Sequence, residues 1–266
     1  MVGASGKMGN FILKEIISDS SLVVGGCFCS DNSAVKGLVV GSMLGLDIHL
    51  DTCFSNDLLD ALNADCIIDF SHFSITTKLV NLCLEKKYSG ILLVGTTALS
   101  SKTYQKLEDL SKTARVAVLS NTTTGIIAMH SLVKNALAAV PNAEVEIVEK
   151  HHSLKDDAPS GTALSLAETV AKQKGLNIND ALQYGRVGKG TKRSHSEIGM
   201  FSMRGGLCSG EHSIQMFFGS EVLEIKHTAS NKSCFAKGAV DIVKKMLPLK
   251  GSCLFTDDNI NKLLLK

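Results

Sequence analysis

Residues 149–163 of the chain read EKHHSLKDDAPSGTA, and this stretch decides how the second half of the protein is organised. Two adjacent histidines, His151 and His152, are followed by Lys155 and then by Pro159 and Ser160. Beyond Ser160, apolar residues recur at helical spacing: Ala163, Leu164, Ala167, Val170 and Ala171. The pattern predicts a helix that begins directly after Ser160, with Ser160 as its N-cap.

The start of this helix predicts a binding site for an anion. Gly161 and Thr162 follow the N-cap Ser160. Backbone N–H groups at a helix start have no partner inside the helix, and they lie at the positive end of its dipole. Lys155 and the two histidines add charge and titratable protons a few residues upstream. Because a proton donor beside a carboxylate-binding group suits the protonation of an acidic small molecule, the stretch predicts an active site.

The first half of the chain alternates short apolar runs with segments of helical periodicity. We expect strands at Leu22–Cys29, Cys66–Phe70, Ile91–Val94 and Val116–Leu119, and helices at Met8–Ile17, Thr76–Lys86 and Lys102–Thr113. Strands that are nearly all apolar and are joined by helices are typical of a parallel sheet covered on both faces. The predicted fold class is therefore α/β, with a Rossmann-like parallel sheet in this half.

The second half predicts a different kind of domain. We expect longer strands at Ala143–Glu149, Glu197–Arg204, Glu211–Phe218 and Val222–His227, with the Ser160 helix after the first of them. Consecutive strands indicate an antiparallel or mixed sheet, so the expected domain is α+β with an open mixed sheet. A last helix at Ala236–Met246 could return to the first domain. The expected domains are residues 1–122 with 233–266 for dinucleotide binding, and residues 123–232 for substrate binding and oligomerisation.

A glycine-rich turn opens the chain. Residues 3–9 read GASGKMG and run directly into the first expected helix. Glycines allow a tight turn and a close approach of the backbone to a pyrophosphate, which the helix start then binds. The polar segments Gly95–Thr97 and Ser120–Asn121 follow later strands, at the carboxyl edge of the sheet where ligands bind. Together the segments predict a dinucleotide site. Alone, the glycine turn is equally compatible with a turn that binds no ligand, and each later segment is better explained as an ordinary polar turn.

The ends of the first two strands leave two questions open. Only two residues precede Gly3, so the first strand is either a stub or lacks residues because the start codon was set late. An acid near the end of the second strand binds the adenosine ribose of NADH, and Asp31 is available there, slightly late. Ser30, Lys7 and Lys36 could instead accept the 2′-phosphate of NADPH. Both cofactors therefore remain candidates.

The composition excludes several classes of partner. The formal net charge of +2 is too small to indicate binding to nucleic acid or to a membrane surface. No apolar run approaches the ~18 residues of a transmembrane helix. The 8 cysteines are scattered without a CxxC pair, which is typical of reduced thiols and predicts a cytoplasmic protein.

Segments spread over the whole chain resemble a known family. They are the glycine loop, Gly95–Thr97, the block from His151 to Thr162, and the segment from Arg204 to His212, which reads RGGLCSGEH. In this order they resemble the dihydrodipicolinate reductases of the diaminopimelate and lysine pathway. The histidine block is highly specific for this family, and the glycine loop is not.

The resemblance implies roles for individual residues. It implies that His151 is the proton donor and that Lys155 is the catalytic lysine. The expected substrate contacts are His152, Ser160, Gly161 and Thr162. The expected cofactor contacts are Gly3, Ala4, Ser5, Gly6, Lys7, Met8, Ser30, Asp31, Gly95, Thr96, Thr97, Leu119, Ser120, Asn121 and Thr122. The family's acid-then-arginine pair at the second strand falls on Cys29 and Ser30, so the usual contact to the adenosine ribose is missing.

The resemblance also implies an activity. Family members reduce 4-hydroxy-tetrahydrodipicolinate, or the dihydrodipicolinate derived from it, by hydride transfer from NADPH or NADH to C4. Electron density moves toward C3 and the ring nitrogen, where a protonated His151 delivers the proton and Lys155 stabilises the negative charge. We expect the dicarboxylate substrate to favour the protonated imidazole. The family further implies a homotetramer built through the sheet of the substrate domain.

Other functions stay open at this stage. The chain could be another NAD(P)-dependent oxidoreductase that acts on a small keto or imino acid, although the cluster of His151, His152 and Lys155 better suits a dianionic ring. It could also be a nucleotide-binding redox sensor without catalysis, although an intact proton donor, lysine and helix start argue against this. We expect no metal site, because the two histidines lack the i,i+4 spacing of a zinc-binding helix and a third ligand nearby.

Overall fold

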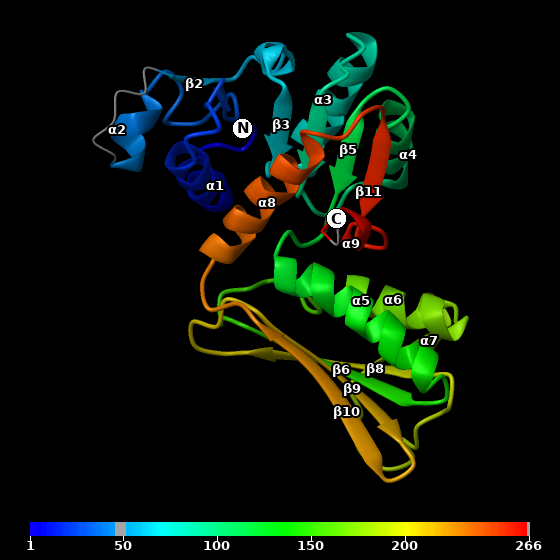
Figure 1. Cartoon of the computed structure of the whole chain (residues 1–266). Coiled ribbons are helices and arrows are strands. Elements are labelled where there is room, and N and C mark those ends of the chain that lie inside the picture. The colour runs from blue at the N-terminus through cyan, green and yellow to red at the C-terminus, as the bar shows by residue number, and fades with distance from the viewer. Residues whose placement is uncertain (46–51, 265–266) are drawn as a thin grey trace. The chain divides into compact units, whose positions relative to one another are not determined.

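The computed structural model describes residues 1–45 and 52–264 (Figure 1). The chain divides into two compact units. Met1–Thr123 and Ser233–Lys266 form the first unit, and Thr124–Lys232 forms the second. The first unit is therefore built from two separate segments of the chain, and each unit has a hydrophobic core of its own.

A parallel sheet forms the centre of the first unit. Its strands are β3 (Cys66–Asp69), β4 (Ile91–Val94), β5 (Arg115–Val118) and β11 (Cys253–Thr256), in the order β11-β5-β4-β3. Every side chain of β4 is buried, as expected for a strand with both faces covered. This arrangement confirms the predicted parallel sheet and adds the strand β11, which the sequence did not predict.

A further pair of strands continues this sheet through the start of the chain. β1 (Cys27–Phe28) pairs in parallel with β2 (Phe54–Ser55). Val2 forms single parallel bridges to Phe28 on one side and to Asp69 on the other. Val2 thus connects β1 to β3, and the glycine turn follows it directly.

Helices flank the parallel sheet. They are α1 (Lys7–Ser18), α2 (Val40–Leu44), the 3-10 helix η1 (Asp60–Asn63), α3 (Phe73–Glu85), α4 (Ser101–Leu110), α8 (Ser233–Met246) and α9 (Asn261–Leu264). α1 packs against α8, and α3 packs against α4. The guanidinium of Arg115 on β5 donates to the carbonyls of Met246, Leu247 and Leu249. It therefore satisfies carbonyl groups at the end of α8 that have no partner within the helix.

A mixed sheet and helices on one of its faces form the second unit (Figure 1). The strands are β6 (Glu144–His151), β7 (Leu182–Tyr184), β8 (Ile198–Arg204), β9 (Glu211–Phe218) and β10 (Glu221–Thr228), in the order β10-β9-β6-β8-β7. The helices are α5 (Thr124–Ala139), α6 (Gly161–Lys174) and α7 (Ile178–Ala181). β6 runs parallel to β8 and antiparallel to β9. The predicted fold class, a Rossmann-like domain with a mixed-sheet domain, is confirmed.

The structure corrects two expectations about individual elements. The expected strand Leu22–Cys29 shrinks to the two residues of β1, because Gly25 and Gly26 precede it and glycines carry no side chain that would stabilise a strand. The helix α5 was not expected at all, although Ile126, Met129, Val133 and Leu137 recur at helical spacing and are buried in the core. α5 begins at Thr124, three residues after the polar segment Ser120–Asn121.

Two further observations concern the surface and the thiols. None of the helices within residues 1–45 and 52–264 is both long and apolar enough to cross a membrane. The cysteines are free thiols, and Cys27 and Cys83 are buried in the first unit. Burial raises the pKa of the Cys83 thiol to about 12, so this cysteine remains protonated at neutral pH.

Candidate active site

β6 places two ionisable side chains on its buried face. Exposure alternates along the strand, so Val145, Ile147, Glu149 and His151 face the core of the second unit. Glu149 is 0% exposed, and His151, at the end of the strand, is 9% exposed. Since a buried carboxylate without partners is strongly unfavourable, the groups around Glu149 determine how this site is held together.

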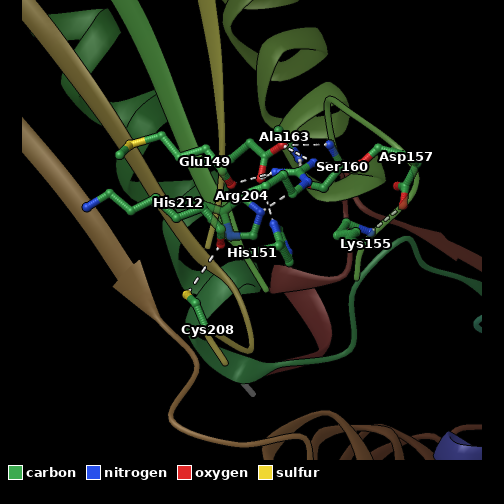
Figure 2. A network of polar contacts seen from close by, with 11 residues as sticks. Glu149, His151, Lys155, Asp157, Ser160, Ala163, Arg204, Cys208 and His212 are labelled. Atoms are coloured by element: carbon green, nitrogen blue, oxygen red, sulfur yellow. Dashed lines mark hydrogen bonds and ion pairs between the residues drawn. The ribbon is translucent and has the colours of Figure 1, made fainter. Parts of the chain in front are cut away.

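Residues from β8 and from the start of α6 hold the Glu149 carboxylate beside His151 (Figure 2). His151 Nδ1 lies 2.6 Å from Glu149 Oε2. The Arg204 guanidinium donates to both carboxylate oxygens, over 2.9 Å to Oε2 and 2.8 Å to Oε1. The backbone N–H of Ser160 also donates to Oε1, over 3.2 Å. The carboxylate is therefore fixed in position and in orientation.

These contacts also determine the charge of Glu149. Burial alone raises the pKa of a carboxyl group, but hydrogen bonds from His151 and Arg204 outweigh it and lower the pKa of Glu149 to about 2. Glu149 is therefore an anion at neutral pH. The same pairing raises the pKa of the Arg204 guanidinium, so the pair remains charged.

Ser160 connects the helix start to a second histidine. Its Oγ accepts from the backbone N–H of Ala163 over 3.2 Å, which makes it the N-cap of α6 as predicted. The same Oγ lies 3.1 Å from Nε2 of His212, a buried residue of β9. Burial and the neighbouring His151 lower the pKa of His212 to about 3, so His212 is neutral. The two imidazoles meet edge to face with 5.3 Å between ring centroids.

The loop between β6 and α6 carries Lys155 and is tied to the same network. The backbone N–H of His152 donates to the Cys208 carbonyl over 2.8 Å. Lys155 Nζ donates to Asp157 Oδ1 over 2.6 Å. The Asp157 carbonyl in turn accepts from Arg204 Nη2 over 2.6 Å. Arg204 thus links the buried Glu149 to the loop that carries the lysine.

The first turn of α6 completes the site. Gly161 and Thr162 begin the helix, and a β-carbon built at Gly161 would meet no described atom within 4 Å. The open space over Gly161 suits a ligand that approaches the helix start. The structure therefore brings the end of β6, the loop with Lys155 and the start of α6 into one region of the second unit.

Three residues of this network were not among the predicted site residues. Glu149, Arg204 and His212 were expected only as members of strands, and no role in the site was assigned to them. One available signal was spacing, because residues i and i+2 of a strand share a face, which puts Glu149 beside His151. The pairing of His151 with Arg204 and of Glu149 with His212 across the sheet depends on strand register, which no local pattern reports.

Metal binding finds no support in this region. Within the part of the chain that the structure describes, no group of three or more His, Cys, Asp or Glu side chains is arranged to hold a metal ion. His151 and His212 are instead committed to hydrogen bonds with Glu149 and Ser160.

In the first unit, the glycine turn has the geometry that a dinucleotide needs. Gly3 has φ of +77°, and a β-carbon there would lie 2.4 Å from the Phe70 carbonyl oxygen. A β-carbon at Gly9 would lie 2.2 Å from the Gly3 carbonyl oxygen. Both positions therefore require glycine, because a side chain at Gly3 would collide with the backbone after β3 and one at Gly9 would push α1 away from the turn. Ala4 is buried in this turn, and Lys7 and Met8 begin α1.

A cavity of about 640 Å³ lies beside this turn. The predicted cofactor residues that line it are Gly3, Ser5, Gly6, Ser30 and Asp31. It lies at the carboxyl ends of β1 and β3, where open parallel sheets bind ligands. The glycine turn and the volume fit a nucleotide cofactor, of which the turn would hold the pyrophosphate.

The remaining predicted cofactor residues lie further along the same sheet edge and do not line this cavity. Gly95 follows β4, and Thr96 Oγ1 accepts from the Ser71 N–H over 3.0 Å; Thr97 comes next and is exposed. Leu119 to Thr122 follow β5. The Ser120 N–H donates to the Asp257 carboxylate over 3.1 Å, while Asn121 accepts from Thr123 and Thr122 donates to the Phe235 carbonyl.

Comparison with known proteins gives consistent matches over the whole chain. Residues 1–122 match a family model described as "Dihydrodipicolinate reductase, N-terminus", and residues 125–259 match "Dihydrodipicolinate reductase, C-terminus". A 4-hydroxy-tetrahydrodipicolinate reductase of Helicobacter hepaticus is 32% identical over 257 residues, 96% of each chain. One of Helicobacter pylori (strain Shi470) is 36% identical over 250 residues, 90% of each chain.

A solved structure has the same fold. The dipicolinate-bound dihydrodipicolinate reductase from Paenisporosarcina sp. TG-14 superposes with a TM-score of 0.73 and covers 97% of this chain and 96% of its own. Its sequence identity is 21%, so this likeness concerns the arrangement of the elements and not the individual side chains.

Proposed function

The chain belongs to the dihydrodipicolinate reductase family and is an NAD(P)H-dependent oxidoreductase, and from this premise we propose its reaction. It reduces 4-hydroxy-tetrahydrodipicolinate, or the dihydrodipicolinate formed from it by loss of water, to tetrahydrodipicolinate in diaminopimelate and lysine biosynthesis. The observation that carries the proposal is the buried pair of His151 and Glu149 in the same network as the N-cap of α6. It provides a proton donor next to an anion-binding helix start.

The substrate is a ring with two carboxylates, and the site offers groups for both charges. The N–H groups of Gly161 and Thr162, at the start of α6, bind one carboxylate, and the α6 dipole stabilises its charge. His152 and Lys155, in the loop before the helix, supply further donors. The ring then lies against the end of β6, where His151 is located.

The chemistry is a two-electron reduction followed by a protonation. A reduced nicotinamide, when bound, would supply the hydride to C4 of the dihydrodipicolinate ring, which forms from the 4-hydroxy compound by loss of water. The electron pair moves toward C3 and the ring nitrogen, and protonated His151 gives its proton to this electron-rich system. Lys155 stabilises the negative charge that develops on the way. His151 is left neutral and takes up a proton from solvent before the next turnover.

We assign nucleotide binding to the first unit and substrate binding to the second. The glycine turn with Gly3 and Gly6, and the cavity that continues toward Ser30 and Asp31, support the first assignment. The sequence segments Gly95–Thr97 and Leu119–Thr122, at the carboxyl ends of β4 and β5, extend the proposed cofactor contacts. NADH and NADPH are both cofactors to be tested.

We further propose a cytoplasmic homotetramer. The free cysteines support a reducing compartment. The face of the mixed sheet opposite α5 and α6 carries exposed apolar residues, among them Phe217 at 36% and Val222 at 57% exposed, which are direct partners on β9 and β10. An exposed apolar sheet face is suited to self-association. Light scattering coupled to size-exclusion chromatography tests the assembly, and a monomeric mass would contradict it.

A coupled assay tests the reaction. Pyruvate and aspartate semialdehyde are condensed by a dihydrodipicolinate synthase, and oxidation of NADH or NADPH is followed at 340 nm. We expect oxidation that depends on the synthase, and a loss of about 10³-fold in kcat for His151→Gln. His195→Gln, which changes an exposed histidine of the same unit, is the control and should retain full activity. No oxidation with either cofactor would overturn the proposal in favour of another imino or keto acid.

A further inference from the structure

We propose that Glu149 is the positioning residue of this reaction: its carboxylate holds the imidazole of His151 in the tautomer and orientation that leave Nε2 to deliver the proton. The inference rests on the proposed function of His151 and extends it to a residue that does not touch the substrate. Glu149 is fully buried on the core side of β6, so it acts through the histidine alone.

The first step of the argument is the hydrogen bond itself. Glu149 Oε2 and His151 Nδ1 are 2.6 Å apart. An ionised carboxylate can only accept, so Nδ1 must carry the proton of this bond. The second ring nitrogen, Nε2, makes no hydrogen bond to any residue in the described ranges. The geometry therefore divides the two nitrogens into one that anchors the ring and one that can exchange a proton with a ligand.

The second step concerns what holds the carboxylate. Oε1 accepts from Arg204 Nη2 and from the Ser160 N–H, and Oε2 accepts from Arg204 Nη1 in addition to His151. Both carboxylate oxygens thus accept hydrogen bonds from the planar guanidinium, and Oε1 also accepts one from the backbone. These bonds keep the carboxylate from rotating away from the imidazole ring. The contact from Ser160 also sets Glu149 relative to the helix start, which links the proton donor to the proposed carboxylate site.

The third step identifies which charged groups face His151. They are Glu149, which is bonded to His151, and His212 on β9, which meets its ring. Arg204 on β8 follows through Glu149, and it contacts the loop with the Lys155–Asp157 pair through the Asp157 carbonyl. Arg204 and Lys155 are each paired with a carboxylate, Glu149 and Asp157 respectively. His212 is neutral and bound to Ser160 through Nε2. The anion in contact with His151 is therefore Glu149, and it is the group that stabilises the imidazolium.

An alternative explanation is that Glu149 and Arg204 form a purely structural ion pair. In that case removal of the charge lowers stability but leaves the pH dependence of turnover and the tautomer of His151 unchanged. A positioning role predicts the opposite, because a neutral amide stabilises the imidazolium less than a carboxylate and can also donate to Nδ1. The two explanations can therefore be separated by experiment.

Glu149→Gln is the first test, with the full-length enzyme in the coupled assay. We expect kcat to fall by about 10²-fold, KM for the substrate to change by less than threefold, and the alkaline limb of the kcat profile to move to lower pH. Glu149→Asp should recover part of the rate. Glu168→Gln, an exposed glutamate of α6, is the matched control. An alkaline limb that stays in place in a folded Glu149→Gln enzyme would overturn the proposal.

A second measurement does not depend on turnover. In wild-type protein with ¹⁵N-labelled histidine rings, the neutral form of His151 should give the shifts of the Nδ1–H tautomer, and His151→Gln assigns the signal by its disappearance. An Nε2–H tautomer in the wild-type protein would exclude the proposed role of Glu149. Because this spectrum is recorded without substrate, it tests the role of Glu149 separately from the proposed reductase reaction.

Discussion

Gly210 leaves Nε2 of His151 uncovered: a β-carbon at position 210 would lie 3.1 Å from that nitrogen. The φ angle of Gly210 is +151°, a conformation that side chains rarely adopt. Its carbonyl accepts from the Ala229 N–H over 2.8 Å, so the backbone at this point is held in place. Glycine at 210 thus keeps the face of the proposed proton donor free for a ligand.

Gly210→Ala should therefore reduce turnover without removing any polar group. We expect kcat/KM to fall by roughly 10- to 100-fold, because the added methyl group either blocks Nε2 or displaces the ring. Steady-state kinetics in the coupled assay measures this. Gly25→Ala is the control, since a β-carbon there would meet no described atom within 4 Å and its φ is not positive. An unchanged kcat/KM in Gly210→Ala would show that the substrate does not approach from this side.

The low pKa of Glu149 predicts how stability depends on pH. The pKa is lowered from 4.5 to about 2 on folding, so the stabilisation is fully present above about pH 4.5 and is lost as pH falls toward 2. The shift corresponds to about 3 kcal/mol of unfolding free energy. The free energy of unfolding of the wild-type protein, measured with urea, should fall over this range, and that of Glu149→Gln should fall less. Equal pH dependence in the two proteins would mean that other carboxylates account for the loss of stability at low pH.

Local features of this chain follow from its sequence, whereas contacts between distant segments do not. Ser160 and the helix behind it were predictable, because capping and helical periodicity are local properties. Glu149 and Arg204 were not recognised as partners, because they are 55 residues apart in sequence and meet only through the register of β6 and β8. β1 was predicted too long because an apolar run does not show where a neighbouring strand ends. α5 was not predicted, although its apolar residues recur at helical spacing, because the run NTTTG at residues 121–125 is typical of a loop and hides the helix start.

Asp31, which lines the proposed cofactor cavity, predicts a preference between NADH and NADPH. Asn56 Nδ2 donates to Asp31 Oδ1 over 2.8 Å, and both residues line the cavity. A carboxylate held there accepts from ribose hydroxyl groups and repels a 2′-phosphate. We expect Asp31→Ser to raise the ratio of kcat/KM for NADPH to that for NADH by about tenfold, because it removes a negative charge that repels the 2′-phosphate. Asp57→Ser, which changes an exposed acid of the same region, should leave the ratio unchanged. A ratio unaffected by Asp31→Ser would place the adenosine ribose elsewhere.

Lys155 and Asp157 should differ sharply in their effect on turnover, although they form one ion pair. The Asp157 side chain is 60% exposed, whereas that of Lys155 is 22% exposed, and an exposed ion pair contributes little to stability. Lys155→Met removes the charge proposed to stabilise the electron-rich ring, so kcat/KM should fall by roughly 10²- to 10³-fold. Asp157→Asn leaves the ammonium in place and should change kcat/KM by less than threefold. Thermal unfolding of both variants controls for folding. Equal losses in the two variants would show that the ion pair itself, by shaping the loop between β6 and α6, is what turnover requires.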